Sequence, residues 1–374
     1  MRDLTAGAVE NPAVPDGRTG GRSPERPDAR LTTAVADVVR ARRSGRIRSA
    51  VVCGTLGAAV LAALCVSLAV GDLFVPLGEV VATLAGGGDG GARFVILELR
   101  LPRALIGLLV GAAFGLSGAV FQTLLRNPLA SPDVIGISSG AGAAGVLASV
   151  AFGASGYALS ASALLGALMT ATAIYALAWR GGVAGYRLVL VGIGIGAALS
   201  SMISHLLTSS DLSEAQNALA WLTGSLNGRS WDQLRPLVVA LALLVPPTFL
   251  AARPLRALQL GDETAVGLGT RVERARLALV FCAVALAGVA TAAAGPVAFV
   301  AFVSAPIARR LVPRRGAALL PAALTGALIV LVADFAAQHL LGSTQFPVGV
   351  VTGVIGAPYL LWLLARANRA GRGG

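Results

Sequence analysis

Lysine is missing from this sequence: all 30 Lys and Arg positions are arginine, and the only other basic side chains are two histidines. A P-loop ATPase site needs a lysine that reaches the nucleotide phosphates, so the chain cannot hold a standard one. His205 and His339 lie far apart, and no HExxH motif occurs. Cys53, Cys65 and Cys282 are scattered without CxxC spacing, which favours buried packing thiols over a metal site or a disulfide. No catalytic residue, metal site or cofactor is predicted.

Charged residues are also scarce. They make up only 13% of the chain, while 56% of its residues are hydrophobic. A soluble domain has about 25% charged and about 45–50% apolar residues. Because a membrane span needs about 20 apolar residues, 374 residues leave room for about ten spans. The composition therefore predicts an all-α, polytopic membrane protein with about ten transmembrane helices.

The apolar segments divide the chain into three parts. Residues 1–46 are rich in Arg, Pro and Gly and are predicted to form a disordered cytoplasmic tail. Residues 47–366 form the predicted transmembrane domain, and 367–374 a second cytoplasmic tail. The first apolar run is too long and begins too late for a signal peptide. The predicted spans are about 49–71, 101–124, 133–152, 156–178, 187–208, 235–252, 275–294, 296–312, 319–340 and 347–365.

The arginines indicate the orientation of these spans. A net charge of +12 can indicate nucleic-acid binding, but here the arginines cluster at the N-terminus and between apolar runs, which favours the positive-inside pattern of membrane proteins. With a cytoplasmic N-terminus, alternation places the basic loops inside and the mixed or neutral loops outside. Both termini are then predicted to be cytoplasmic. The predicted inner positions are Arg126, Arg180, Arg187, Arg253, Arg256, Arg271, Arg274, Arg276, Arg309, Arg310, Arg314 and Arg315.

Only one acid, Asp334, lies well inside a predicted span. It leaves an ion-coupled secondary carrier as an alternative, because such carriers need ionisable groups at membrane depth. A buried carboxylate satisfied by a neighbouring helix is the interpretation we favour. Glycines at four-residue spacing, as in Gly107, Gly111 and Gly115, predict close helix packing, which either shapes a pathway or only stabilises the bundle.

The loop of about 253–276 is the most informative polar segment. Asp262 and Glu263 would lie in the first turn of a short helix, where acids favour the positive end of the helix dipole, and Gly267 and Gly269 would end it. Such a helix could dock into a cleft on a soluble partner. From the residues alone, a solvated turn is the favoured interpretation.

Several sequence blocks, in order, resemble the permeases of iron–siderophore and vitamin B12 importers, the FecCD/BtuC type. The resemblance covers about residues 50–366 and is carried by Leu99-Arg100-Leu101-Pro102-Arg103, Gly111-Ala112-Ala113, Asn127-Pro128-Leu129-Ala130, Gly136-Ile137-Ser138, Trp221-Leu222-Thr223-Gly224-Ser225-Leu226, Leu260–Gly269 and Pro347-Val348-Gly349. Ser225–Arg229 is similar to the ferric siderophore branch, and Gln338 stands where the B12 permeases have a further arginine.

The resemblance implies the partners and the site residues. It implies an ABC importer in the cytoplasmic membrane, with a second permease that is homologous or identical, separate cytoplasmic ATPases and an extracytoplasmic siderophore-binding protein. It implies binding-protein docking at Arg100 and Arg103, and structural roles for Asn127, Pro128, Pro347 and Gly349. It assigns ATPase coupling to Asp262, Glu263, Thr264, Ala265, Gly267, Leu268 and Gly269.

Overall fold

The computed structural model describes residues 27–71, 73–179, 185–312, 317–339 and 345–370, and its regular elements in these ranges are all helical. The first elements are α1 (Pro27–Ala69), α2 (Leu77–Leu84), α3 (Gly90–Phe94), the π-helical η1 (Val95–Arg100), α4 (Leu101–Leu124), α5 (Ile137–Phe152), α6 (Gly156–Ala178), α7 (Gly185–Ser209) and α8 (Leu212–Leu222). They are followed by α9 (Trp231–Leu250), α10 (Ala252–Gln259), α11 (Asp262–Gly267), α12 (Val272–Ala294), α13 (Val300–Leu311), α14 (Leu319–His339) and α15 (Val348–Ala370).

The chain divides into two units, Met1–Ile47 and Arg48–Gly374. In the described part of the first unit, the chain is helical from Pro27, where the sequence analysis expected a disordered tail. Residues 1–26 and 371–374 lie outside the described residues. The helix bundle and all features below belong to the second unit.

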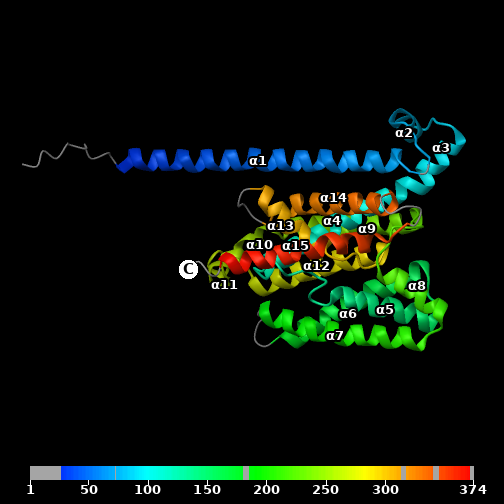
Figure 1. The fold of residues 1–374 in the computed structure, drawn as a ribbon. Coiled ribbons are helices and arrows are strands. Elements are labelled where there is room, and N and C mark those ends of the chain that lie inside the picture. Colours follow the sequence, from blue (N-terminus) through cyan, green and yellow to red (C-terminus); the bar gives the residue numbers. More distant parts are fainter. Residues whose placement is uncertain (1–26, 72, 180–184, 313–316, 340–344, 371–374) are drawn as a thin grey trace, which may run out of the picture. The chain divides into compact units, whose positions relative to one another are not determined.

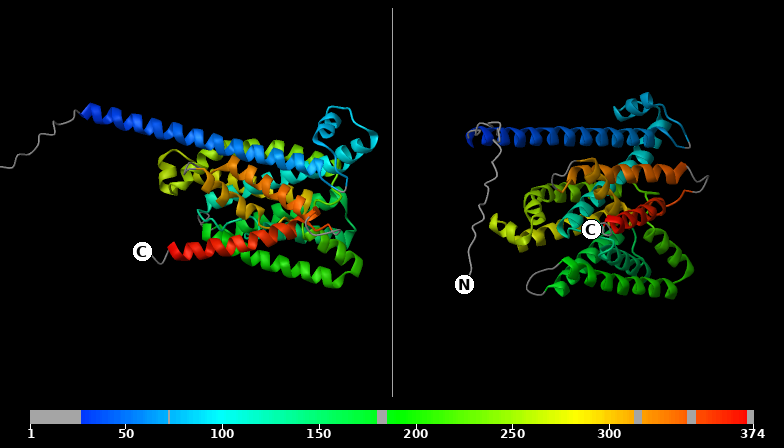
Figure 2. Two further views of the ribbon diagram at one scale, coloured as in Figure 1. Left: turned by 45° about the horizontal axis from the view of Figure 1, so that its top comes forward. Right: turned by 60° about the vertical axis from the view of Figure 1, so that its left-hand side comes forward.

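Helices α4 and α12 form the interior of the bundle. Most of their side chains are buried, and they pack on each other and on α6, α9, α13 and α14. Small residues allow this close packing: a Cβ on Gly111 of α4 would overlap the backbone of Gly326 of α14. Buried hydrogen bonds add to it, from the Ser117 hydroxyl to Ala283 O (2.6 Å) and from the Gln122 amide to Phe302 O (2.9 Å). By contrast, α7 lies along one edge of this unit and exposes much of its surface (Figures 1 and 2).

Seven helices of the described ranges are long and apolar enough to cross a membrane, and two shorter apolar helices, Ile137–Phe152 and Val348–Leu363, accompany them. Every predicted apolar run contains a helix, and 101–124 and 156–178 coincide with α4 and α6. The helix within the predicted span 296–312 is shorter than expected. Gly295–Phe299 is not helical, and α13 has only 12 residues. A helix of that length spans roughly 18 Å, less than the hydrocarbon core of a bilayer. The membrane-protein class is confirmed, while ten spans remain a prediction.

The two ends of the bundle differ in charge. We call the end that carries α10, α11 and Arg126 the basic end, and the end that carries α8 and the start of α4 the opposite end (Figure 1). Helices α4, α6 and α9 run toward the basic end, and α12 and α14 run away from it. The charged side chains of the site lie at these two ends.

Candidate functional site

A short helix, α11, projects from the basic end between α10 and α12. It begins at Asp262 after Gly261, which has a φ of +116°, and Gly269 with a φ of +78° follows its end. Both backbone conformations favour glycine. Asp262 and Glu263 lie in the first turn, as the sequence predicts. The segment is therefore a short helix and not the solvated turn that the residues alone favoured.

Asp262 ties this helix to two other parts of the bundle. Its Oδ2 accepts from Arg276 Nη2 of α12 at 2.9 Å, and its Oδ1 lies 3.5 Å from Arg126 Nη2. Arg126 follows α4 and also donates to the carbonyl of Leu258 in α10. Arg276 reaches Glu273 as well, at 3.4 Å. These charge contacts therefore link α11 to α12 and to the end of α4.

The outer surface of the same segment is apolar. Leu260, Val266 and Leu268 are 66%, 62% and 64% exposed, whereas Ala265 is buried against the bundle. Large apolar side chains that face away from the bundle on a projecting loop indicate a contact surface for another protein. The predicted coupling residues thus include two that contact the bundle, the half-exposed Asp262 and the buried Ala265, and an outward group around Leu268.

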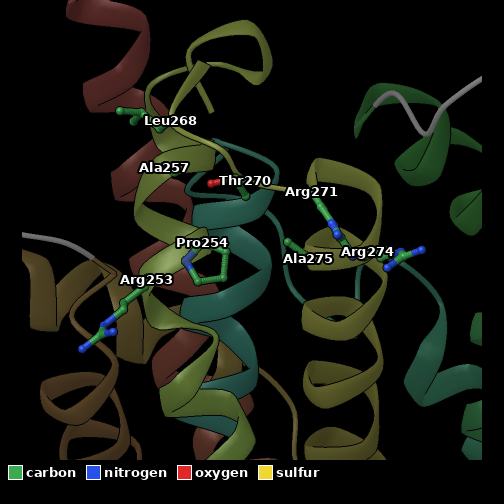
Figure 3. A pocket seen from close by; sticks show the side chains of 8 residues that line it. All are labelled: Arg253, Pro254, Ala257, Leu268, Thr270, Arg271, Arg274 and Ala275. Carbon is green, nitrogen blue, oxygen red and sulfur yellow. The ribbon is translucent and has the colours of Figure 1, made fainter. Parts of the chain in front are cut away.

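A groove lies beside α11 that the sequence analysis did not predict. Its volume is about 580 Å³, and it is lined by Arg253, Pro254, Ala257, Leu268, Thr270, Arg271, Arg274 and Ala275. Figure 3 shows Arg253 on α10 on one side, Arg271 and Arg274 at the start of α12 on the other, and Pro254 and Ala275 between them. The sequence showed only that this loop is rich in arginine. It did not show that α10 and the start of α12 face each other across a groove.

Asn127 and Pro128 shape the loop between α4 and α5. Asn127 Oδ1 accepts from the Leu129 amide at 2.9 Å, and the Asn127 amide donates to Gln122 O at 3.2 Å, so the segment turns sharply after α4. Later in this loop, Asp133 accepts a hydrogen bond from the Ser138 hydroxyl. The turn directly follows Arg126, whose side chain reaches α10 and α11.

Pro347 and Gly349 mark another junction, at the start of α15. The Gly349 amide donates to Gly224 O at 3.0 Å, and a Cβ on Gly349 would overlap the Thr223 carbonyl. The Ser225 amide donates to Ala294 O at 2.8 Å. The block that follows α8, the end of α12 and the start of α15 therefore meet, and glycine is required at the closest approach.

Arg100 and Arg103 lie at the opposite end, and both have partners within the chain. Arg100 Nη1 donates to Leu68 O at 2.8 Å, and its Nη2 to Leu73 O. Arg103 holds Asp334 of α14 through two bonds, Nε to Oδ2 at 3.0 Å and Nη2 to Oδ1 at 2.8 Å. The side chains of Arg103 and Asp334 are only 14% and 7% exposed.

Asp334 is fully engaged. Besides the two bonds from Arg103, its Oδ2 accepts from Gln338 Nε2 at 2.8 Å. A bidentate arginine partner supplies the hydrogen bonds that a buried carboxylate needs. The interpretation of Asp334 as a buried residue satisfied by a neighbouring helix is confirmed. Gln338 therefore contributes to this cluster.

Comparison with known proteins identifies the bundle. The sequence profile of the FecCD transport family matches residues 59–366. The chain belongs to the FecCD transport family. The permease is 42% identical over 299 residues to the ferric enterobactin transport system permease protein FepG of Escherichia coli (strain K12), covering 80% of this chain and 91% of FepG. It is 42% identical over 310 residues to the achromobactin transport system permease protein CbrC of Dickeya dadantii (strain 3937), covering 82% and 89% of the two chains.

A solved structure supports the same assignment. A metal-chelate type ABC transporter in an inward-facing conformation matches with a TM-score of 0.73 and 29% identity, covering 84% of this chain and 98% of that one. The FecCD chain is therefore the permease component of an ABC transporter and not an enzyme, and the ATPase is a separate subunit. This agrees with the absence of lysine, which leaves no standard P-loop.

Proposed function

We propose that this permease imports a ferric chelate of the siderophore class across the cytoplasmic membrane. The observation that carries the proposal is the 42% identity to the enterobactin permease over 91% of that protein. The iron(3+)-hydroxamate permease FhuG of Bacillus subtilis (strain 168), 39% identical over 87% of its length, is a permease for a different ferric chelate. The relatives share iron chelates as a class, so the proposal names the class.

The basic end faces the cytoplasm in this proposal. Arginine-rich loops stay on the inner side of the membrane, and Arg126, Arg253, Arg271 and Arg310 all lie near that end. With ten spans, both termini are cytoplasmic. The exposed surface of α7 offers the second permease, homologous or identical, a place to pack. The chelate then passes along the interface between the two permeases by alternating access.

In this proposal, α11 couples ATP hydrolysis to movement of the transmembrane helices. The ATPase subunit contacts the outward residues Glu263, Thr264, Gly267, Leu268 and Gly269 and moves the helix when its nucleotide sites close. Asp262 passes this movement to α12 through Arg276 and to the end of α4 through Arg126. Because α4 and α12 form the interior of the bundle, a shift of both changes the packing of most other helices.

The siderophore-binding protein docks at the opposite end, near Arg100 and Arg103. Both guanidinium groups already have acceptors in this chain, so an acid on the binding protein must compete with them. The exposed charges of this contact guide the approach of the binding protein more than they add to its affinity. If Arg103 exchanged Asp334 for an acid of the binding protein, α14 would be held less tightly to α4. Docking of the binding protein would then change the packing of the bundle.

The test is uptake of radioactive iron by a deletion strain that carries this gene on a plasmid. We expect restored uptake for at least one ferric siderophore in a panel of catecholates, hydroxamates and citrate. Free ferric iron at the same concentration serves as the control. Restoration by no iron chelate, together with restored uptake of an unrelated solute, would reject the proposed substrate class.

The alternative is an ion-coupled carrier that depends on Asp334. The bidentate contact with Arg103 favours the ABC importer, since it leaves neither oxygen of Asp334 free to bind and release an ion. Right-side-out vesicles supplied with binding protein distinguish the two. Uptake should stop when internal ATP is depleted with the proton gradient intact, and continued uptake would establish the carrier.

A further inference from the structure

A second groove, largely apolar, lies at the opposite end of the bundle between α6 and α9. Its volume is about 420 Å³, and we call it the α6–α9 groove. Val289, Ala292 and Ala293 of the interior helix α12 form its floor, while α6 contributes Leu164 and α9 contributes Leu237. The three floor residues are at most 8% exposed. The groove therefore cuts into the side of the bundle as far as α12.

The surface around the α6–α9 groove matches the hydrocarbon of a membrane. Leu165 and Met169 of α6 are more than half exposed, and so are Val239 and Leu243 of α9. Membrane-spanning helices can turn such side chains toward lipid tails, because their backbone polar groups are satisfied within the helix. A hydrocarbon chain is therefore the ligand that fits an apolar groove on this surface.

Two aromatic residues place the mouth of the groove at the membrane surface. Tyr157, in the first turn of α6, lines the groove and is 61% exposed. Trp231 is the first residue of α9, and its Nε1 donates to Leu97 O at 2.9 Å. Tyrosine and tryptophan are enriched where the bilayer meets water. Polar groups at this mouth therefore lie at the depth of lipid head groups.

Asp232 provides acceptors for a cationic group at this mouth. It is exposed, it lines the groove, and it forms no ion pair within the part of the chain that the structure describes. Pro236, which also lines the groove, has no amide hydrogen, so the Asp232 carbonyl lacks its usual helical donor. A primary ammonium group, with three N–H donors, matches these acceptors.

Arg235 adds a cation next to this site. It is exposed and follows Asp232 by three residues, so it lies about 4.5 Å further along α9, toward the middle of the bundle. A guanidinium group binds phosphate well. From the mouth inward, α9 thus presents an acid, then a base, and then the apolar side chains of the groove.

We propose that the α6–α9 groove binds phosphatidylethanolamine, with one acyl chain in the groove, the ammonium group at Asp232 and the phosphate at Arg235. In this lipid the ammonium lies outermost, the phosphate next and the acyl chains deepest, which is the order of the groups on α9. Phosphatidylcholine has a quaternary nitrogen without N–H donors, and phosphatidylglycerol has no cation for Asp232. Because α6 and α9 both pack on α12, the bound lipid fills a gap in the bundle.

The head-group contact is tested by native mass spectrometry of the full chain in detergent. Palmitoyl-oleoyl phosphatidylethanolamine, phosphatidylcholine and phosphatidylglycerol are added at equal concentrations. We expect the wild type to bind phosphatidylethanolamine about fivefold more tightly than either of the others. Asp232→Asn should remove this preference and Asp232→Glu should keep it. Asp211→Asn, an exposed acid at the same end that does not line the groove, should leave the preference unchanged.

The groove itself is tested by filling it. Ala161 and Ala176 are both exposed on α6, but only Ala161 lines the groove. Ala161→Phe should lower the affinity for phosphatidylethanolamine about fivefold or more, because its ring takes the place of part of the acyl chain. Ala176→Phe should leave the affinity unchanged. Ala161→Leu replaces Ala161→Phe if the thermal unfolding of the phenylalanine variant is altered.

Three results would overturn the proposal. The first is equal affinity of the wild type for the three lipids, or a preference for phosphatidylglycerol. The second is a preference for phosphatidylethanolamine that survives both Asp232→Asn and Ala161→Phe, which would place the lipid elsewhere. The third is a changed oligomeric state of Ala161→Phe with unaltered lipid binding, which would show that a second copy of the chain covers the groove.

Discussion

At the scale of single residues, a variant of Asp262 can test whether binding of the ATPase and use of its energy are separate. Its carboxylate contacts Arg126 and Arg276 rather than the outward surface. We predict that Asp262→Asn keeps ATPase affinity within about twofold, because exposed ion pairs contribute little to stability, but lowers ATP-driven chelate uptake about tenfold. Uptake into proteoliposomes and ATPase binding are measured on the same preparation.

Asp211→Asn is the matched control for this variant. Asp211 precedes α8 at the opposite end, and its side chain makes no capping hydrogen bond. The Asp211→Asn variant should leave both chelate uptake and ATPase affinity unchanged. Parallel losses of uptake and of ATPase affinity in Asp262→Asn would place Asp262 in the docking surface instead.

The pair of Arg103 and Asp334 decides stability at the same scale. Removal of one partner leaves a buried charge without compensation, so Asp334→Ala should destabilise the protein by about 3–5 kcal/mol. The double variant Arg103→Met/Asp334→Leu replaces the pair by apolar side chains and should recover most of the loss. Thermal unfolding in detergent measures both. A double variant as unstable as the single one would contradict this account.

At the scale of helices, the contact of α4 with α14 depends on glycines where the two backbones approach most closely. A Cβ on Gly111 would overlap the Gly326 carbonyl, whereas a Cβ on Gly353 of α15 meets no atom within 4 Å. Gly111→Ala should therefore lower the free energy of unfolding by about 1–3 kcal/mol, and Gly353→Ala should change it little. The comparison uses thermal unfolding in the same detergent. Equal stability of the two variants would show that the helices adjust freely.

Helix positions were largely predictable, because a lipid-facing or buried apolar run is visible in the sequence itself. The runs 101–124 and 156–178 coincide with α4 and α6. The short helices α2, α8 and α10 were missed, since they are too short or too polar to resemble spans. The Gly295–Phe299 break was missed because its residues are as apolar as the helix that follows.

The site was predictable only in part, for a related reason. Asp262 and Asp334 stood out as acids in unusual positions. Their partners Arg276, Arg126 and Arg103 could not be assigned, because the pairs join helices that are adjacent only in the folded bundle. The groove of α10 and α12 depends in the same way on helices whose faces the sequence does not orient.

At the scale of the whole molecule, the proposed orientation can be measured directly. A background with Cys53, Cys65 and Cys282 replaced by alanine receives one new cysteine, at Ser155 or at Gln259, both exposed and at opposite ends. A membrane-impermeant maleimide should label Ser155→Cys on intact cells, and Gln259→Cys only after the cells are broken. The reverse pattern would place the basic end outside and reject the positive-inside assignment.

The long separation between Arg103 and Asp334 also bears on how the protein is made. The two residues are 231 positions apart. At about 5–20 residues per second, the ribosome needs roughly 10 to 50 s to synthesise the stretch between them. During that interval Arg103 has entered the membrane without its counter-ion, and its long side chain can only reach for the polar headgroups. The start of α4 can therefore form its ion pair with α14 only after α14 has been translated.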